Sequence, residues 1–437
     1  MRTRLPLWLA GTTLVTACNL DLTNPTAPTE QDILTTREGI VALAVGLQAR
    51  YGAGMADFVY PGGLVTDELG ATLAALPSYK DVEAGNDMIN TFDAVETPWR
   101  SHYRTIKTAD DLLNNARNVT LGDSTLSGIL TISYLFKAMS LGELLQLYQR
   151  IPITTYHVTA PTFVDRATAL ATVLALLDSA LTQYKAVNPG SEFNTSIRAA
   201  GLDVKNTIFA MQARYERIAG NDAAALAAAD SVNLGVASVM PFSDQAINPI
   251  HDLSNRAGYV KPVDSLRLQA EAGDTLRIRY HVTVAAITGN LQALDNFTQY
   301  ASNSAPIPFY YPGEVMLIRA EALLNQADIP GARAAVNAVR AKCGGAPNQP
   351  IACLAPLADT LLDTDPEIRA EIYRQRRFEL YATGLRWEDA RRLGLVGAGS
   401  LAYRCWLVYP FSERNVNPNV PPDPEPPQAP AFPAVCF

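Results

Sequence analysis

Apolar residues recur with the period of an α-helix along most of the chain, and this period restricts the fold to a mainly helical one. In residues 37–50, Ile40, Leu43, Ala44 and Leu47 follow the i, i+3, i+4, i+7 pattern of one helical face. Similar patterns predict helices over residues 97–117, 124–149, 165–186, 201–219, 222–233, 312–327, 330–342, 366–383 and 386–393.

Several of these predicted helices form pairs that are joined by short turns. Gly220-Asn221 separates one pair, and Ile329-Pro330-Gly331 separates the helices over 312–327 and 330–342. Alanines alternate with leucines and valines in the second pair, and small residues let two helices approach closely. This pattern is typical of tetratricopeptide-like (TPR-like) hairpins, but the strict repeat of about 34 residues is absent. We therefore expect a degenerate array of helix pairs.

Two long stretches, residues 51–96 and 236–311, lack a clear helical period, and we expect them to be irregular loop insertions. Within the second, apolar residues alternate with period two on both sides of Ala272-Gly273-Asp274, which predicts a small β-hairpin there. The alternating residues are Leu266, Leu268, Ala270, Leu276, Ile278, Tyr280, Val282 and Val284. Long irregular segments on a helical body are often functional.

The first residues are typical of an export signal. Arg2 and Arg4 precede an uncharged apolar stretch, residues 5–17, that is too short to cross the ~30 Å hydrocarbon core as a helix. The stretch ends at Cys18, and residues 15–18 resemble a bacterial lipobox. We therefore expect a lipoprotein signal peptide over 1–17, lipidation of Cys18 and a tether over 18–30. The alternative is an ordinary secreted protein in which Cys18 is incidental.

The formal net charge of -8 argues against a nucleic-acid-binding protein, which needs a basic surface. Only 4 histidines are present, and no Cys or His spacing suggests zinc, so we expect neither a metal nor a cofactor. Besides Cys18, Cys343, Cys353, Cys405 and Cys436 permit three disulfide pairings. The short separation of Cys343 and Cys353 suggests a local bridge, and Cys405–Cys436 would then pin the proline-rich tail, residues 421–437.

Several stretches, in order along the chain, resemble the SusD/RagB family of nutrient-capturing surface lipoproteins. The lipobox with LDLTNP is the first of them, and EIYRQRRFELYATGLRWEDARRLG (371–394) is the most specific. The others are WRSHYRTIKTADDLL (99–113), YYPGEVMLIRAEALLNQADIPGARAAVNAVRAKCG (310–344) and, more weakly, VYPFSERNVNPN (408–419). A Thr at position 383 departs from the Glu that is common in the family.

The resemblance implies one mainly α SusD-like domain over residues 31–420. Its fold would be a right-handed superhelix of degenerate TPR-like helix pairs, with long irregular loops and a small β-hairpin. For the residues that match the family, elementary physics favours a structural role, since Arg–carboxylate pairs across Gly384 would fix the angle between two helices. We expect this role for Arg377, Glu379, Arg386, Trp387 and Asp389.

In the family, ligand contacts come from the two irregular regions. Capture of an oligosaccharide needs flat aromatic faces together with amides and carboxylates that bond the hydroxyl groups. The ligand-binding residues that we predict are Tyr79, Trp99, Tyr300, Asp67, Asn90 and Asn296. The alternative is that these aromatic residues pack beneath their own loops, and the ligand could equally be a peptide.

The function implied by the resemblance is that of a lipoprotein on the surface of the outer membrane. It would bind a nutrient and deliver it to a TonB-dependent SusC-like transporter. The alternatives are a TPR-like scaffold that binds only protein, and a hydrolase. We do not expect an enzyme, because no histidine has the spacing of a nucleophile or metal site, and adjacent carboxylates such as Asp110-Asp111 do not define an acid/base pair.

The lipobox predicts that acyl chains are attached to Cys18. In bacteria that express the full chain, radiolabelled palmitate should enter the wild-type protein and not the Cys18→Ala variant. Label in the variant, or none in the wild-type protein, would contradict the lipoprotein interpretation.

Overall fold

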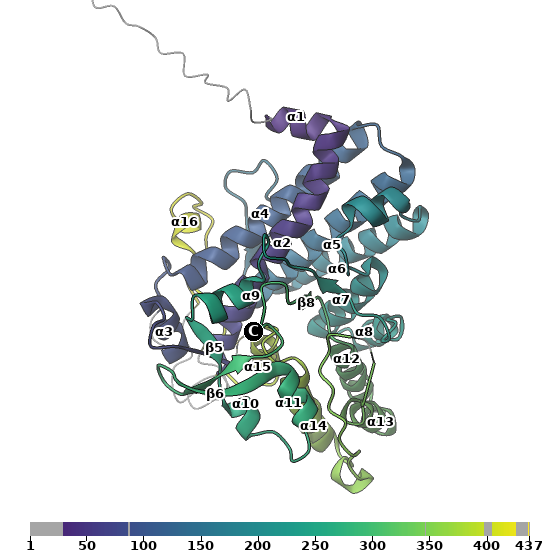
Figure 1. Ribbon diagram of the computed structural model, residues 1–437. Coiled ribbons are helices and arrows are strands. Elements are labelled where there is room, and N and C mark those ends of the chain that lie inside the picture. Colours follow the sequence, from purple (N-terminus) through teal and green to yellow (C-terminus); the bar gives the residue numbers. More distant parts are fainter. Residues whose placement is uncertain (1–28, 86–87, 346, 397–403, 425–435, 437) are drawn as a thin grey trace, which may run out of the picture.

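Long helices stack side by side through most of the described chain (Figure 1). The computed structural model describes residues 29–85, 88–345, 347–396, 404–424 and 436. Each predicted helix has a counterpart here. These are α2 (Arg37–Val65), α4 (Asp93–Asn115), α5 (Asp123–Leu147), α6 (Arg166–Ala186), α7 (Val204–Ala219), α8 (Asp222–Asp230), α12 (Pro312–Asn325), α13 (Ile329–Arg340), α14 (Asp365–Glu379) and α15 (Arg386–Arg392).

Helices that are neighbours in this series are also neighbours in space. α2 packs on α4, and α5 packs on both α4 and α6. The pairs α7/α8 and α12/α13 continue the stack, and α14 lies against the last of them. Ala320 and Ala332 are fully buried where α12 meets α13, which is the close approach that small residues allow. The predicted degenerate array of helix pairs is therefore confirmed.

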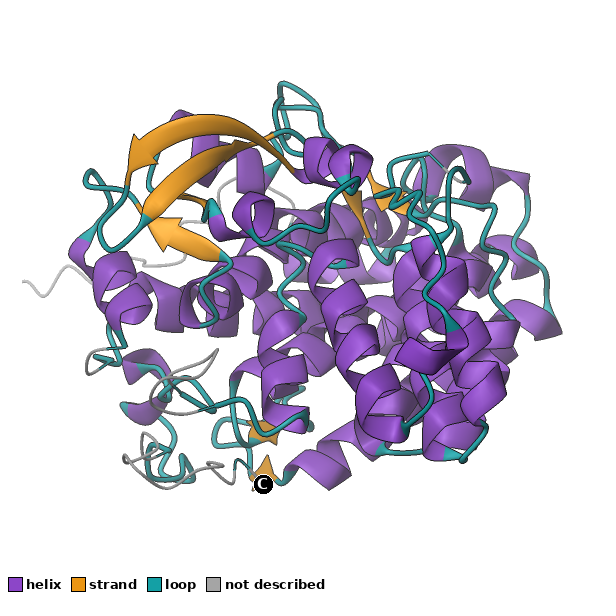
Figure 2. Cartoon of the chain, turned by 90° about the horizontal axis from the view of Figure 1, so that it is seen from below, coloured by secondary structure: helices purple, strands orange, loops and turns teal. Residues whose placement is uncertain are grey.

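Short helices and strands fill the connections between the long helices. The strands form four antiparallel pairs, of which β6 with β7 is the longest, and Figure 2 shows these strands beside the helical body. The pairs are β1 (Leu69–Ala71) with β5 (Val260–Pro262), β2 (Ile151–Pro152) with β3 (Phe163–Val164), β4 (Val239–Met240) with β8 (Ile307–Pro308), and β6 (Val282–Thr288) with β7 (Ala293–Phe297). The short helices are α1 (Glu30–Thr35), α3 (Pro77–Ala84), α9 (Pro249–His251), α10 (Ser265–Leu268), α11 (Thr275–His281) and α16 (Phe411–Arg414).

The prediction of an irregular stretch over 51–96 is wrong for its first part, because α2 continues without a break to Val65. This half of α2 is buried on almost every side, so it has no polar face and no amphipathic period. Its glycines serve close packing rather than turns. At Gly62, a Cβ would lie 3.1 Å from the carbonyl oxygen of Gly384, and at Gly52 it would clash with Met240.

The predicted β-hairpin lies farther along the chain than expected. Residues 275–281 form helix α11, and the hairpin consists of β6 and β7, with Gly289 and Gln292 closing the turn. The alternating apolar pattern was misleading because the buried face of α11 is polar. It carries Arg277 and His281, whereas Leu276 is 49% exposed.

Both predicted disulfides are present. Cys343–Cys353 closes a local loop after α13, and Cys405–Cys436 holds a residue of the proline-rich tail against the body. The predicted signal peptide and the lipidation site Cys18 lie outside the described residues. Helix α5 is long and apolar enough to cross a membrane, but 89% of its most apolar window is buried inside the protein, as in a core helix.

Of the residues for which we predicted a structural role, Glu379, Arg386, Trp387 and Asp389 are buried, and an Arg–carboxylate pair crosses the turn at Gly384 as predicted. The ion pair across the turn at Gly384 joins Arg376 to Asp389 at 2.7 Å. Arg377 instead contacts Gln269, and the indole Nε1 of Trp387 donates to the Arg404 carbonyl at 2.6 Å. Arg386 approaches Glu68 of the α2–β1 turn only to 3.9 Å.

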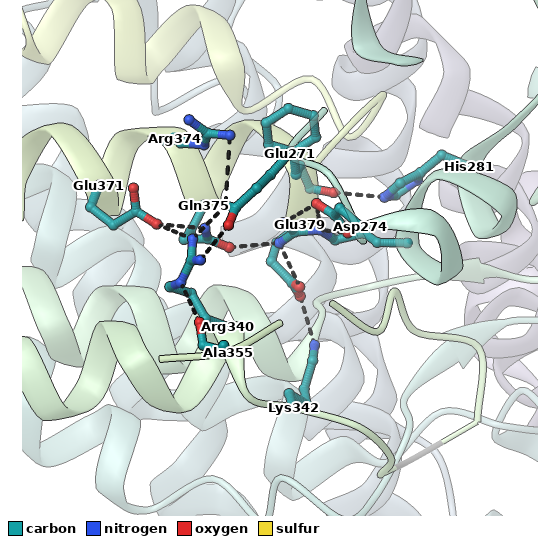
Figure 3. A network of polar contacts seen from close by, with 12 residues as sticks. Glu271, Asp274, His281, Arg340, Lys342, Ala355, Glu371, Arg374, Gln375 and Glu379 are labelled. Carbon is teal, nitrogen blue, oxygen red and sulfur yellow. Dashed lines mark hydrogen bonds and ion pairs between the residues drawn. The ribbon is translucent and has the colours of Figure 1, made fainter. Parts of the chain in front are cut away.

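Glu379 lies at the centre of a buried polar network that joins several elements (Figure 3). Its carboxylate accepts hydrogen bonds from Arg277 of α11 at 3.2 Å and from Lys342, just after α13, at 2.7 Å. Arg277 also donates to Asp274 and to Gln375 of α14. This network fixes the segment that leads into β6 onto the helical body.

Replacement of Glu379 by Gln should leave the buried Lys342 without its counter-charge and should leave Arg277 with Asp274 alone. We expect the Glu379→Gln variant to lose about 3 kcal/mol of unfolding free energy in urea titrations, because an unpaired buried charge is expensive. The exposed pair Arg319–Asp230 provides the control, and Asp230→Asn should change the value by less than about 1 kcal/mol. Equal effects of the two variants would contradict the structural role of Glu379.

Candidate functional site

A small cavity of about 140 Å³ opens where α2, the start of α4, α3 and α9 meet. Its wall contains two tyrosines, three carboxylates and several prolines. The lining residues are Ala56, Asp57, Tyr60, Pro61, Tyr79, Asp93, Ala94, Thr97, Pro98, Pro249, Asp252 and Leu253. Because this volume is below the ~300 Å³ of a site for a drug-sized ligand, the cavity suits a single ring or chain end.

The two tyrosines supply the aromatic surface of the cavity. Tyr60 of α2 is held rigidly, since its hydroxyl donates to the Ile250 carbonyl of α9 at 2.7 Å and only 4% of the residue is exposed. Tyr79 of α3 is half-buried, and its ring lies 6.3 Å from that of Tyr259. Tyr79 can therefore offer part of a flat face to a ligand, whereas Tyr60 forms the fixed wall.

Asp57 is the most deeply placed carboxylate of the cavity. Burial raises its pKa to about 6, and the hydrogen bond with Ser101 and the charge of Arg100 offset only part of this effect. A carboxylate with such a pKa can accept hydrogen bonds from hydroxyl groups at neutral pH and is partly protonated in mild acid.

The other two carboxylates lie at the rim. Asp93 is the first residue of α4, where the helix dipole favours negative charge, and it is exposed. Asp252 is also exposed and pairs with Arg256 at 2.7 Å. No Lys or Arg is among the described residues that line the cavity, so the site favours neutral or cationic groups over anions.

Of the predicted aromatic ligand residues, only Tyr79 lies in this cavity. Trp99 is 4% exposed and is packed among Tyr103, Tyr148, Phe163 and Tyr409. Its prediction as a ligand platform is wrong, because no ring face is left for a ligand and the residue is a core anchor.

Tyr300 is likewise buried, at 2% exposure, beside an internal cavity of about 40 Å³ that is separate from the first. Its ring packs on Phe297, and its carbonyl contacts His251 Nδ1 at 2.9 Å. A ligand could reach this tyrosine only after the surrounding core opened, so its prediction as a ligand residue is also wrong.

The three predicted polar ligand residues are separated from one another. Asp67 follows α2 and lies near Arg386, and burial raises its pKa. Asn296 of β7 accepts a hydrogen bond from Lys261 of β5 at 2.7 Å. The Asn90 carbonyl accepts from the Phe411 amide at 3.0 Å. These contacts are within the protein, and none of the three lines the cavity.

The structure does bring the two predicted ligand regions together. β1 pairs with β5, β5 contacts β7, and the Asn290 amide donates to the Ala71 carbonyl at 2.8 Å. Sequence reasoning missed Asp57, Asp93 and Asp252 as site residues. Asp57 and Tyr60 share one face of α2, a relation that is visible only when residues 51–65 are recognised as helical.

Comparison with known proteins identifies similar folds. Residues 279–419 match the model of the SusD family. NanU of B. fragilis has 14% identity, with 92% of this chain and 99% of that one covered and a TM-score of 0.69.

Two further solved structures are similar. A laminarin binding SusD-like protein has 14% identity over 89% of this chain and 99% of its own, with a TM-score of 0.67. A SusD-like carbohydrate binding protein from Bacteroides vulgatus has 13% identity over 82% and 84%, with a TM-score of 0.65. At these identities the likeness establishes the fold. No curated protein matches.

The raised pKa of Asp57 predicts a pH-dependent cost in stability. Because the folded state binds the proton more tightly than the unfolded chain, this group makes unfolding easier as pH rises from about 4 to about 6. At pH 7.5, Asp57→Asn should therefore raise the free energy of unfolding by at most about 3 kcal/mol, and the gain should vanish near pH 3.5. Urea titrations of the wild-type protein and the variant at the two pH values measure this gain in unfolding free energy. A gain of equal size at both pH values would contradict a raised pKa of Asp57.

Proposed function

Because the chain belongs to the SusD/RagB family, we propose that it is an outer-membrane lipoprotein that binds a nutrient, an oligosaccharide, and delivers it to a TonB-dependent SusC-like transporter. The family match over residues 279–419 carries the proposal. Two structural neighbours, one a laminarin binding SusD-like protein and one a SusD-like carbohydrate binding protein, support the ligand class.

The chemistry of the cavity at Asp57, Tyr60 and Tyr79 agrees with an oligosaccharide. Tyr79 offers an aromatic face to the C–H surface of a sugar ring, and the carboxylates accept hydrogen bonds from its hydroxyl groups. The absence of cations among the described lining residues favours neutral over acidic sugars. We place the end of a neutral chain in this cavity.

We propose binding without turnover. His102 and His281 are enclosed, and burial lowers their pKa to about 3 and about 4 respectively, so neither is placed to exchange protons with a bound ligand. The carboxylates of the cavity come with no nucleophile activated by a neighbouring base. The expected fate of the ligand is transfer, with the lipid at Cys18 holding the protein beside the transporter.

Binding to a glycan array by the mature protein, with Tyr79→Ala for comparison, tests the proposal. The wild-type protein should bind neutral glycans, and Tyr79→Ala should weaken that binding about tenfold or more, since stacking and area burial are lost. Its melting temperature should change little because Tyr79 is only half-buried.

Tyr156→Ala is the matched control. Tyr156 is also half-buried and also lies against a neighbouring ring, that of His157, but it is outside the cavity. Retained binding in Tyr156→Ala and lost binding in Tyr79→Ala would support the site. If no glycan binds the folded wild-type protein, the protein-scaffold alternative replaces the proposal, and glycan cleavage would show an enzyme.

A further inference from the structure

A second and larger hollow lies between α6 and the end of α7, away from the cavity at Tyr79. It has a volume of about 680 Å³, which is within the range of ligand sites. One wall is aliphatic and is formed by Leu170, Ala171 and Leu174 of α6 with Ile218 of α7. The polar side chains that line the hollow are the guanidinium groups of Arg166, Arg217 and Arg392 and the amide of Asn221.

These three arginines belong to a charge cluster that is rich in cations. Arg166 contacts Glu388 at 2.5 Å, and Arg392 contacts Glu321 at 2.6 Å and Asp389 at 2.8 Å. Arg217 also contacts Glu321. Arg391 contacts Glu388, and Arg376 contacts Asp389. Five guanidinium groups thus share three carboxylates.

Asp222 also attracts Arg217 from the start of α8. Five guanidinium groups so close together stand out in a chain whose formal charge is -8. A cluster of cations within hydrogen-bond reach of a hollow attracts anions.

Arg217 is the group that most needs a further partner. It is 9% exposed, and its Nε is buried without any hydrogen-bond acceptor. Burial and the neighbouring charges of Arg392 and Arg376 lower the pKa of its guanidinium to about 9. An oxyanion in the hollow would satisfy this donor and relieve the repulsion.

The aliphatic wall limits what can carry that anion. No Trp, Tyr or Phe is among the described residues that line the hollow, so a sugar ring would find no stacking surface. Ala167 and Ala171 are exposed, and Leu174 is partly exposed, which leaves apolar surface uncovered. Burial of an alkyl chain against this wall is favourable.

We propose that this hollow binds an amphiphilic anion, an aliphatic chain that ends in a carboxylate or phosphate, with the head group at Arg217 and Arg392 and the chain along α6. The site is independent of the sugar cavity and of the proposed nutrient function.

Isothermal titration with octanoate, octyl phosphate, 1,2-octanediol and octyltrimethylammonium tests the proposal. All four share the alkyl chain and differ in the charge of the head. The two anions should bind, and the neutral and cationic compounds should bind at least about tenfold more weakly, since charge complementarity contributes to the affinity. Added salt should weaken the binding of the anions. If octanediol binds as well as octanoate, or if neither anion binds, the proposal is overturned.

Ala171→Glu places a negative charge on the exposed wall without disturbing the core. It should reduce octanoate affinity by about tenfold or more through like-charge repulsion. Ala227→Glu adds the same charge at an exposed alanine of α8 outside the hollow and should leave the affinity unchanged. Tyr79→Ala should also leave octanoate binding unchanged. Equal loss in both glutamate variants would show that only net charge matters and would overturn the site.

Discussion

The fold depends on the buried carboxylate of Glu379, which holds two cations from different parts of the chain. Arg277 comes from α11, before the hairpin, and Lys342 comes from the segment just after α13. Glycine is required at Gly313 of α12, because any Cβ there would clash with the Glu379 side chain. The contacts of this one side chain therefore link α11, α12, α14 and the segment after α13.

This anchor also positions the candidate binding site, through the strands. α11 leads directly into β6, β6 pairs with β7, and β7 contacts β5, whose partner β1 follows α2. The glycine-rich second half of α2 carries Asp57 and Tyr60 to the cavity wall. The segment from 236 to 311 is thus tied to the helical body by buried polar contacts.

The sequence alone was sufficient to predict the helical body, because amphipathic helices with short turns repeat a strong pattern. It was insufficient where burial removes that pattern. Residues 51–65 are enclosed on nearly all sides, and their glycines and Pro61 resemble loop signals although they permit close helix packing. α11 buries Arg277 and His281 rather than its apolar residues, so the alternation of apolar residues wrongly predicted a strand there.

The site was predicted only in part, for a related reason. Residue type can identify aromatic and carboxylate side chains that suit a sugar, but it cannot show which of them face outward. Trp99 and Tyr300 have the right chemistry and are core residues, whereas Asp57 has the right position and belongs to a helix that looked irregular. The family resemblance indicated two regions that the fold brings together, and only the three-dimensional packing shows which of their side chains line a cavity and which lie in the core.

A crystal structure of the mature protein with the glycan that it binds most tightly tests the account most directly. The account predicts a sugar ring against Tyr79, with a hydroxyl group within hydrogen-bond distance of Asp57 and with α2, α3, α4 and α9 in their present positions. Glycan density in the hollow between α6 and α7, or a rearranged core that exposes Trp99 or Tyr300 to the sugar, would contradict it.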